Sequence, residues 1–169
     1  IILDGGLGRQ LKAMGAPFRQ PEWSAAALID GPHFVRAAHD AFITAGADVI
    51  TTNSYALVPH HIGEETYAHR GNELLSIAAR EAKQAASAAE RHVRVAASVP
   101  PMFGSYLPEA FDSVRGRKMM KQFRRQLAPV ADIFCGETLG STAEVMAFLD
   151  VFGDVAADLW VSVTLEDVE

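Results

Sequence analysis

The sequence predicts an α/β fold in which helices flank a parallel sheet. Strand-like and helix-like segments alternate along the 169 residues. The strand-like segments, such as residues 49–52, are short apolar runs and do not alternate apolar with polar residues. Strands of this kind are buried on both faces, as they are when helices cover a parallel sheet. Two architectures fit, an open doubly wound sheet and a closed (β/α)8 barrel, and the pattern alone does not choose between them.

Turn and cap residues mark the ends of the expected elements. The first apolar run ends at Asp4-Gly5-Gly6, which is typical of a buried strand followed by a tight turn. Ser141 and Glu144 form a capping-box pattern at the start of the last helix. The expected strands are residues 1–3, 49–52, 93–99, 131–135 and 159–163; the expected helices are 7–14, 33–45, 72–90, 117–127 and a last one to about 152; loops are expected at 17–23, 53–63 and 102–112.

Composition excludes several classes of protein. Hydrophobic residues make up 49% and charged residues 21%, which is usual for a soluble globular domain. A net charge of −6 argues against a nucleic-acid partner. No apolar run approaches the ~20 residues that span a membrane, and no signal-peptide pattern opens the chain. Cys135 is the single cysteine; no internal disulfide can form, and we expect a cytoplasmic protein.

Both ends of the sequence lie inside or directly beside expected elements. Ile1 already belongs to an apolar run, and residues 165–169 directly follow the last expected strand. About five strand units are present, whereas a closed barrel needs eight. We therefore expect the sequence to be part of a longer chain.

Polar residues stand where the expected strands end. Parallel α/β folds bind ligands at the carboxyl ends of their strands, which meet at one edge. Asp4 follows the first strand and Glu137 follows the fourth. Their carboxylates are candidates to hold an ammonium group, because carboxylates pair with cations. Gly5 and Gly6 would let a ligand approach the backbone closely.

Several blocks of the sequence resemble the homocysteine S-methyltransferase family. They are residues 3–8 (LDGGLG), Trp23-Ser24, residues 45–55 (AGADVITTNSY) and Glu137-Thr138, and their order and spacing match from residue 1 to about 163. The block at 45–55 is quite specific to the family. The resemblance implies a TIM (β/α)8 barrel of which about the first five β/α units are present. Residues 1–169 would then be the N-terminal part of a single homocysteine-binding barrel domain.

The resemblance also implies an activity. Enzymes of this family move a methyl group from a small donor (S-methylmethionine, betaine or methyl-folate) to the thiol of homocysteine, which gives methionine. A zinc ion holds the thiol as a thiolate at neutral pH. The zinc cysteines are expected downstream of Glu169, so we expect the residues given to bind no metal and to be inactive without the rest of the barrel. The implied partners are a small-molecule thiol and a methyl donor, with a homo-oligomer also possible.

The same resemblance assigns roles to residues at the strand ends. Asp4 and Glu137 would bind the amino group of homocysteine. Trp23 and Tyr55 would face the donor, whose positive charge would gain ~0.5–2 kcal/mol from aromatic rings. The implied substrate-binding residues are Asp4, Gly5, Gly6, Trp23, Asn53, Tyr55 and Glu137.

Other interpretations stay open from the residues alone. Asp4 could cap the following helix, and Trp23 could be a core aromatic. His60 and His61 are expected in a surface loop rather than at a metal, and Cys135 as a buried structural thiol. The chain could belong to a different barrel enzyme, such as an aldolase or isomerase, that uses the same acids. It could also be a non-catalytic truncated barrel that binds a thiol or self-associates through its exposed edges.

Overall fold

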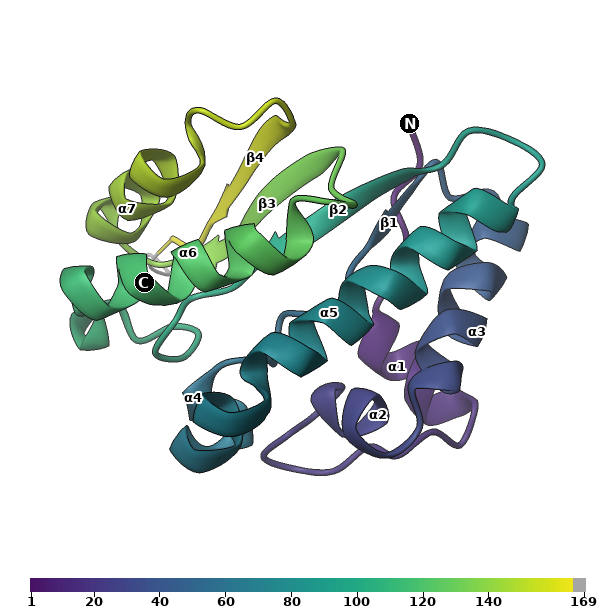
Figure 1. Cartoon of the computed structure of the whole chain (residues 1–169), viewed down its shortest axis with the longest axis horizontal. Helices are drawn as coiled ribbons and strands as arrows, with labels where there is room; N and C mark the ends of the chain where they lie inside the picture. The colour runs from purple at the N-terminus through teal and green to yellow at the C-terminus, as the bar shows by residue number, and fades with distance from the viewer. Residues whose placement is uncertain (166–169) are drawn as a thin grey trace.

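The sheet consists of parallel strands that follow one another in sequence order. The structure, a computed structural model, describes residues 1–165; residues 166–169, with which the predicted domain ends, lie outside the described part. The strands are β1 (Val49–Thr51), β2 (Arg94–Val99), β3 (Ile133–Leu139) and β4 (Asp158–Val163), in the order β1-β2-β3-β4 (Figure 1). Each neighbouring pair is parallel.

The expected first strand, residues 1–3, is reduced to a single bridge. Leu3 forms a parallel bridge with Val49 at the edge of the sheet. The Asp4 N–H donates to the Val49 carbonyl, and the Ile2 carbonyl accepts from Asp48 and Val49. These bonds place the residues beside β1, although the segment is too short to count as a strand of the sheet.

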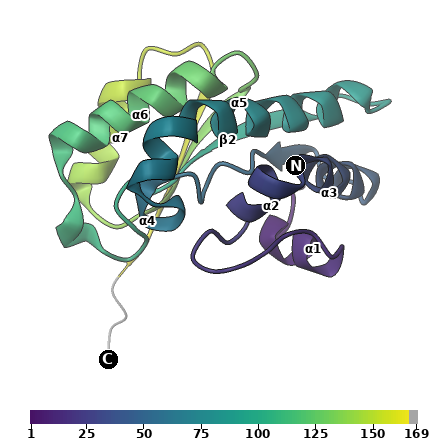
Figure 2. The same ribbon diagram turned by 60° about the horizontal axis from the view of Figure 1, so that its bottom comes forward.

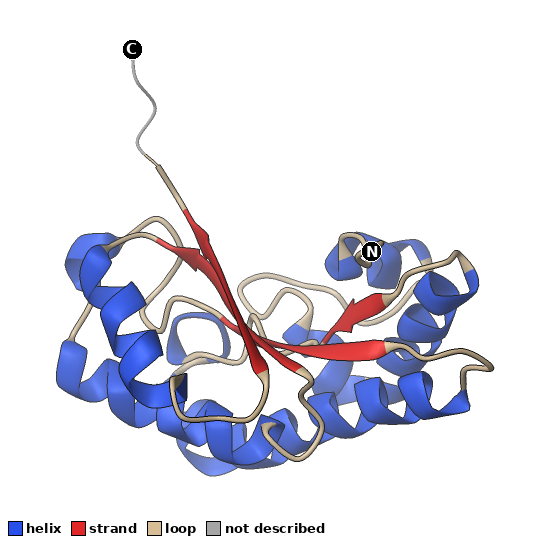
Figure 3. Ribbon diagram, turned by 90° about the horizontal axis from the view of Figure 1, so that it is seen from above, coloured by secondary structure: helices blue, strands red, loops and turns tan. Residues whose placement is uncertain are grey.

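The strand order decides between the two architectures that the sequence left open. A doubly wound sheet reverses its strand order at a switch point, whereas here every strand neighbours the next one in sequence. Because crossovers between parallel strands are right-handed, such an order places the helices on one face. Figure 3 shows the long helices along one face of the sheet. The fold is a sector of a (β/α) barrel, which confirms the predicted fold class.

The helices connect successive strands and differ from the expected ones mainly at their starts. α5 begins at Glu64 rather than at residue 72, and α6 begins at Ser113 rather than at 117. α4 lies in a segment expected as a loop, and α2 was not expected at all. The helices are α1 (Leu7–Ala13), α2 (Ala25–Asp30), α3 (Pro32–Thr44), α4 (Pro59–Ile62), α5 (Glu64–Ala88), α6 (Ser113–Leu127) and α7 (Thr142–Phe152), with a 3-10 turn, η1, at Pro108–Ala110.

Two ends of the molecule carry different helices. Figure 2 shows α1, α2 and α3 grouped away from α6 and α7, with α5 running between the groups. The Ser141 cap predicted for α7 is present, since its hydroxyl accepts from the Glu144 N–H at 3.2 Å. The Glu144 carboxylate accepts from the Gly140 N–H at 2.8 Å, one residue before the N-cap rather than at it. In the part of the chain that the structure describes, no helix is both long and apolar enough to cross a bilayer.

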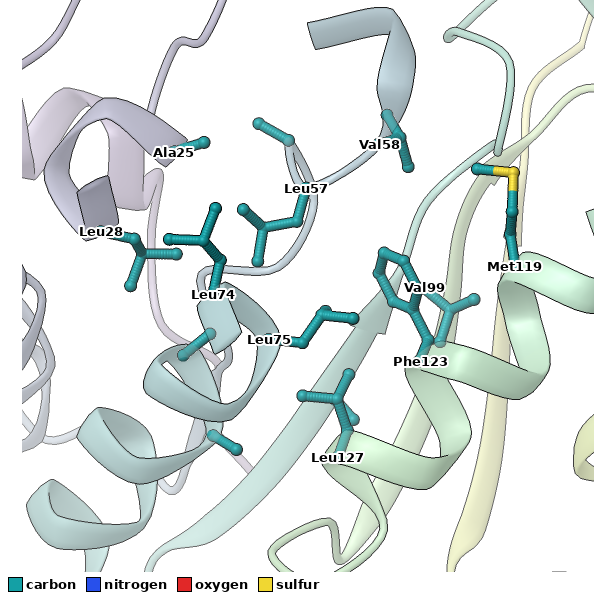
Figure 4. Close-up of a cluster of buried hydrophobic side chains, with 14 of the residues drawn as sticks. Ala25, Leu28, Leu57, Val58, Leu74, Leu75, Val99, Met119, Phe123 and Leu127 are labelled. Carbon is teal, nitrogen blue, oxygen red and sulfur yellow. The ribbon is translucent and has the colours of Figure 1, made fainter. Parts of the chain in front are cut away.

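The main core lies between the sheet and the helices. Leu75 of α5, Phe123 and Leu127 of α6 and Val99 of β2 are fully buried there (Figure 4). Burying side chains of this size stabilises the fold by ~1.5–3 kcal/mol each. The core therefore holds the ends of the strands firmly against α5 and α6.

The opposite face of the sheet corresponds to the interior of the barrel. It carries a smaller cluster of Val49, Ala96 and Ile133, against which Trp160 is partly buried. Side chains alternate between the two faces along a strand. The same alternation brings Thr51, Ser98 and Glu137 to the interior face at the carboxyl ends of β1, β2 and β3, where a ligand would bind.

Candidate functional site

The carboxyl ends of β1, β2 and β3 surround a cavity of about 430 Å³, which we call the carboxylate cavity. It also receives the segment that follows Leu3. Of the seven residues predicted for the site, those that line this cavity are Asp4, Gly5, Gly6, Asn53, Tyr55 and Glu137. Residues far apart in sequence are thus brought together, as expected for the ends of parallel strands.

Asp4 is held in the cavity wall by β1. Its carboxylate accepts from the Thr51 N–H at 2.7 Å and from the Thr51 hydroxyl at 2.9 Å. The N-cap of α1 is Gly6, and no side chain caps that helix. The alternative that Asp4 caps the helix is therefore wrong. Burial raises the pKa of Asp4, and the bonds from Thr51 oppose that rise.

Glu137 faces the same cavity from β3. The Ser98 hydroxyl donates a hydrogen bond to its carboxylate. Burial raises the pKa of Glu137; the bond from Ser98 lowers it, and the negative charge of Asp4 raises it further. Among the described residues, no Lys, Arg or His lines this cavity. Two crowded carboxyl groups without a cation favour a ligand that brings a positive charge.

The two predicted glycines differ in what they permit. A Cβ atom on Gly5 would lie 3.1 Å from the Phe42 ring, so packing explains this glycine. A Cβ atom on Gly6 would meet nothing closer than the Arg9 side chain at 3.9 Å. Gly6 therefore leaves room at the cavity wall, where a ligand can approach the backbone.

A second pocket, of about 360 Å³, adjoins the carboxylate cavity, and we call it the aromatic pocket. Trp23 and Phe18 pack edge to face there, with ring centroids 5.9 Å apart. The Tyr55 hydroxyl lies 2.5 Å from that of Ser105. Within residues 1–165, the lining carries no Asp, Glu, Lys or Arg; it consists of Gly8, Phe18, Trp23, Ser24, Tyr55, Ala56, His61, Ser105 and Tyr106. Gly8, Ser24 and Tyr55 line both spaces.

Trp23 and Asn53 have separate parts in building this pocket. Trp23 is 42% exposed, so the alternative that it is a core aromatic is wrong. Asn53 is buried, and its side-chain N–H donates to the Ser24 carbonyl at 2.9 Å. This bond fastens the loop after β1 to the segment that carries Trp23. Asn53 thus lines the carboxylate cavity while its amide nitrogen holds the neighbouring loop in place.

Several lining residues were not predicted. Phe18 and Tyr106 come from irregular loops, whose sequences have no periodicity that could reveal their direction. His61 was expected in a surface loop, but it lies half-buried in α4 and lines the aromatic pocket, where burial lowers its pKa. Ser98 did carry a signal, because it stands at the end of an expected strand like Asp4 and Glu137.

No metal centre is formed by the residues that the structure describes. Among residues 1–165, no three His, Cys, Asp or Glu side chains are close enough together to hold a metal ion. Cys135 is half-buried on β3, where burial and the charge of Glu137 raise the pKa of its thiol to about 12. At neutral pH the thiol is therefore protonated and unreactive.

The chain is similar to known methyltransferases over its whole length. The family profile described as homocysteine S-methyltransferase matches residues 1–169. Homocysteine S-methyltransferase 1 of Zea mays is 29% identical over 89% of the chain, and selenocysteine Se-methyltransferase of Brassica oleracea var. italica is 28% identical over 98%. The chain covers 53% and 56% of these relatives, so it spans little more than half of their length.

Solved structures agree with the sequence comparison. The metallated form of the homocysteine methyltransferase MmuM from Escherichia coli superimposes with a TM-score of 0.73 at 26% identity. The match covers 99% of the chain and 64% of MmuM. The oxidised form of MmuM has a TM-score of 0.81 at 24% identity, which supports the fold. From the profile that spans all its residues, the chain belongs to the homocysteine S-methyltransferase family.

Proposed function

We propose that the complete protein transfers a methyl group from a small cationic donor to the thiol of homocysteine. One observation carries the proposal: among residues 1–165, a cavity with two partly buried carboxyl groups and no Lys, Arg or His adjoins an aromatic pocket without Asp, Glu, Lys or Arg. An amino-acid substrate supplies an ammonium group for the first space. A methylated onium compound suits the second, because aromatic rings attract diffuse positive charge.

In the carboxylate cavity, we assign Asp4 and Glu137 to the ammonium group of homocysteine. Thr51 and Ser98 hold the two carboxylates by hydrogen bonds, so little reorganisation is needed when the substrate arrives. The positive charge of the ammonium group also relieves the repulsion between the two acids. Gly6 leaves the space through which the substrate can pass close to the backbone.

In the aromatic pocket, we assign Trp23 and Tyr55 to the methyl donor. A volume of about 360 Å³ is near the lower end of the ~300–1,000 Å³ range of ligand pockets. This size favours S-methylmethionine or betaine over a methyl-folate.

In the transfer, the thiolate sulfur forms a bond to the methyl carbon, and the bond from that carbon to the donor breaks. Its electron pair stays on the sulfur or nitrogen atom of the donor, which loses its positive charge.

Zinc enters the proposal through the family. The described residues do not provide a metal site, and its cysteine ligands are expected downstream of Glu169. When bound, the metal would stabilise the thiolate of homocysteine at neutral pH. The chain residues described above act on the amino group and the donor, and the roles of the two acids can be tested by binding alone.

The amino-group assignment is tested by calorimetric titration of the complete protein with homocysteine and with 4-sulfanylbutanoate, which lacks the amino group. Glu137→Gln should weaken homocysteine about 10–100-fold, because a hydrogen bond to a charged group contributes ~1.5–3 kcal/mol. It should leave 4-sulfanylbutanoate within about twofold. Glu90→Gln, at an exposed position, is the matched control. Equal affinity of the wild type for the two thiols would refute the assignment.

The donor assignment is tested at Trp23. Trp23→Leu keeps an apolar side chain but removes the ring, so KM for S-methylmethionine should rise about 2–30-fold. Trp23→Phe should recover part of this loss. A complete protein that uses a methyl-folate faster than either onium compound would show that the donor is of another class.

A further inference from the structure

Three buried hydroxyl groups join the ends of β1 and β2 behind Glu137. They belong to Thr52, Ser54 and Ser98, which are 2%, 0% and 0% exposed. The Ser98 N–H donates to the Thr52 hydroxyl oxygen at 3.0 Å, and the Ser54 hydroxyl donates to the Ser98 carbonyl at 2.7 Å. The hydroxyl oxygens of Thr52 and Ser54 are 2.8 Å apart. Both backbone polar groups of Ser98 are therefore fixed by side chains of the neighbouring segment.

The direction of each hydrogen bond follows from the number of protons. A hydroxyl group has one proton to donate, and Ser54 gives its proton to the Ser98 carbonyl, which can only accept. The proton between Thr52 and Ser54 must then come from Thr52. These bonds reach the Ser98 backbone, whereas its side-chain hydroxyl donates to the Glu137 carboxylate. The Thr52–Ser54 pair thus fixes the backbone from which the Ser98 hydroxyl reaches Glu137.

We infer that Ser98 is a positioning residue that keeps Glu137 ionised and aimed at the amino group of the thiol substrate. The inference rests on the proposed function of the carboxylate cavity. Asp4 obtains its two hydrogen bonds from Thr51, on a different strand from Ser98. Each acid thus has its own donor from the strand beside it, and the donor for Glu137 is set by the Thr52–Ser54 pair.

The cavity needs such a donor because it opposes the ionised state of Glu137. Burial raises the pKa of Glu137, and so does the negative charge of Asp4. Two acids in one cavity tend to share a proton, and a protonated Glu137 would no longer attract an ammonium group. The hydrogen bond from Ser98 stabilises the charged form. Cys135 is another titratable group near Glu137; its pKa is raised to about 12, so it stays neutral below pH 8.

The test measures binding of homocysteine and of 4-sulfanylbutanoate to the complete protein by calorimetry between pH 5 and 8. In Ser98→Ala, homocysteine affinity near pH 6 should fall about tenfold, and the pH below which binding is lost should rise by about one unit. The affinity for 4-sulfanylbutanoate should stay within about twofold. Ser98→Thr, which restores the hydroxyl, should recover the wild-type pH profile.

A second variant covers the case in which Ser98→Ala does not fold. Ser54→Ala removes the hydrogen bond to the Ser98 carbonyl and leaves Glu137 unchanged. It should raise the pH below which homocysteine binding is lost, by a smaller amount than Ser98→Ala does. Equal loss for both thiols, with an unchanged pH profile, would overturn the inference, because it indicates a purely structural serine. If the wild type itself does not prefer homocysteine to 4-sulfanylbutanoate, the amino-group assignment fails first and the inference falls with it.

Discussion

At the scale of single residues, unusual backbone conformations occur in or beside the lining of the aromatic pocket and the carboxylate cavity. Within residues 1–165, the non-glycine residues with positive φ are Trp23 (48°), Tyr106 (63°) and Thr138 (60°). Trp23 and Tyr106 line the aromatic pocket, and Thr138 directly follows Glu137. Each such conformation costs ~1–3 kcal/mol and tends to persist at functional sites. Their positions support a role in binding for both spaces.

A buried histidine on α3 makes stability depend on pH. His39 is fully buried, and within the described residues neither of its ring nitrogens has a hydrogen-bond partner. Burial lowers its pKa from 6.5 to about 4; Asp40 opposes this shift, and Arg36 adds to it. The unfolded chain therefore binds the proton first. The contribution of neutral His39 to stability is complete above pH 6.5 and is lost as the pH falls toward 4.

His39→Leu should remove this dependence. Relative to the wild type, the variant should gain about 2 kcal/mol in free energy of unfolding when the pH is lowered from 8 to 5. Urea unfolding at both pH values measures the change. His92→Leu, at an exposed position, is the control and should parallel the wild type. If the free energy of unfolding of His39→Leu changed with pH as it does in the wild type, His39 would have to gain a partner when it is protonated.

A rule about strand ends predicted that Asp4 and Glu137 lie close together. Asp4 follows the residue that bridges to β1, and Glu137 lies near the end of β3. The carboxyl ends of parallel strands meet wherever the sheet forms, so sequence order places the two residues together. Phe18 and Tyr106 could not be found in this way. They enter the aromatic pocket from loops, and the course of a loop depends on contacts that no local pattern encodes. The link from Ser98 to Glu137 also depends on the register between β2 and β3.

At the scale of elements, errors in the predicted helices arose where local sequence and tertiary packing differ. The prediction began α5 at residue 72, where the Ala-rich stretch starts; residues 64–71, which precede it, include Gly71. In the structure, Gly71 lies where α5 meets α6: a Cβ atom there would be 3.1 Å from the Gln122 side chain. The Tyr67 hydroxyl also donates to Gln122 at 3.0 Å. Packing against α6 thus extends the helix beyond what the local sequence predicts.

A glycine near the start of α6 allows an aromatic ring to pack on the helix. A Cβ atom on Gly116 would lie 2.5 Å from the Phe111 ring, which packs edge to face with Phe103 at 6.0 Å. Gly116→Ala gains ~1 kcal/mol of helix propensity but must displace this ring, at a cost of ~1–3 kcal/mol. We expect a net loss of about 1 kcal/mol in the free energy of unfolding, measured by urea denaturation.

A double-mutant cycle separates the two effects. In a Phe111→Leu background the ring is absent, so Gly116→Ala should stabilise the protein by about 1 kcal/mol through helix propensity. A loss of equal size in both backgrounds would show that the ring does not limit this position.

At the scale of the whole molecule, strand order carried information that the local pattern lacked. Short apolar strands are common to doubly wound sheets and barrels, and only the pairing of strands distinguishes them. The sequence order β1-β2-β3-β4 leaves an edge at each side of the sheet. Apolar side chains are exposed at these edges: Ile1, Ile2, Leu3, Val161 and Val163. In a closed barrel, further strands would cover both edges.

Because unpaired strand edges with apolar side chains favour association, the 169-residue chain on its own should self-associate. Light scattering should give a mass that rises with concentration above the 18.2 kDa of one chain. Val163 of β4 is 55% exposed, and Val163→Lys should lower that mass because a charge at an edge opposes pairing. Val114→Lys, on α6 and 81% exposed, adds the same charge away from the edges and should leave the mass unchanged. A chain that is monomeric at every concentration, or two lysine variants with the same effect, would show that the edges do not drive association.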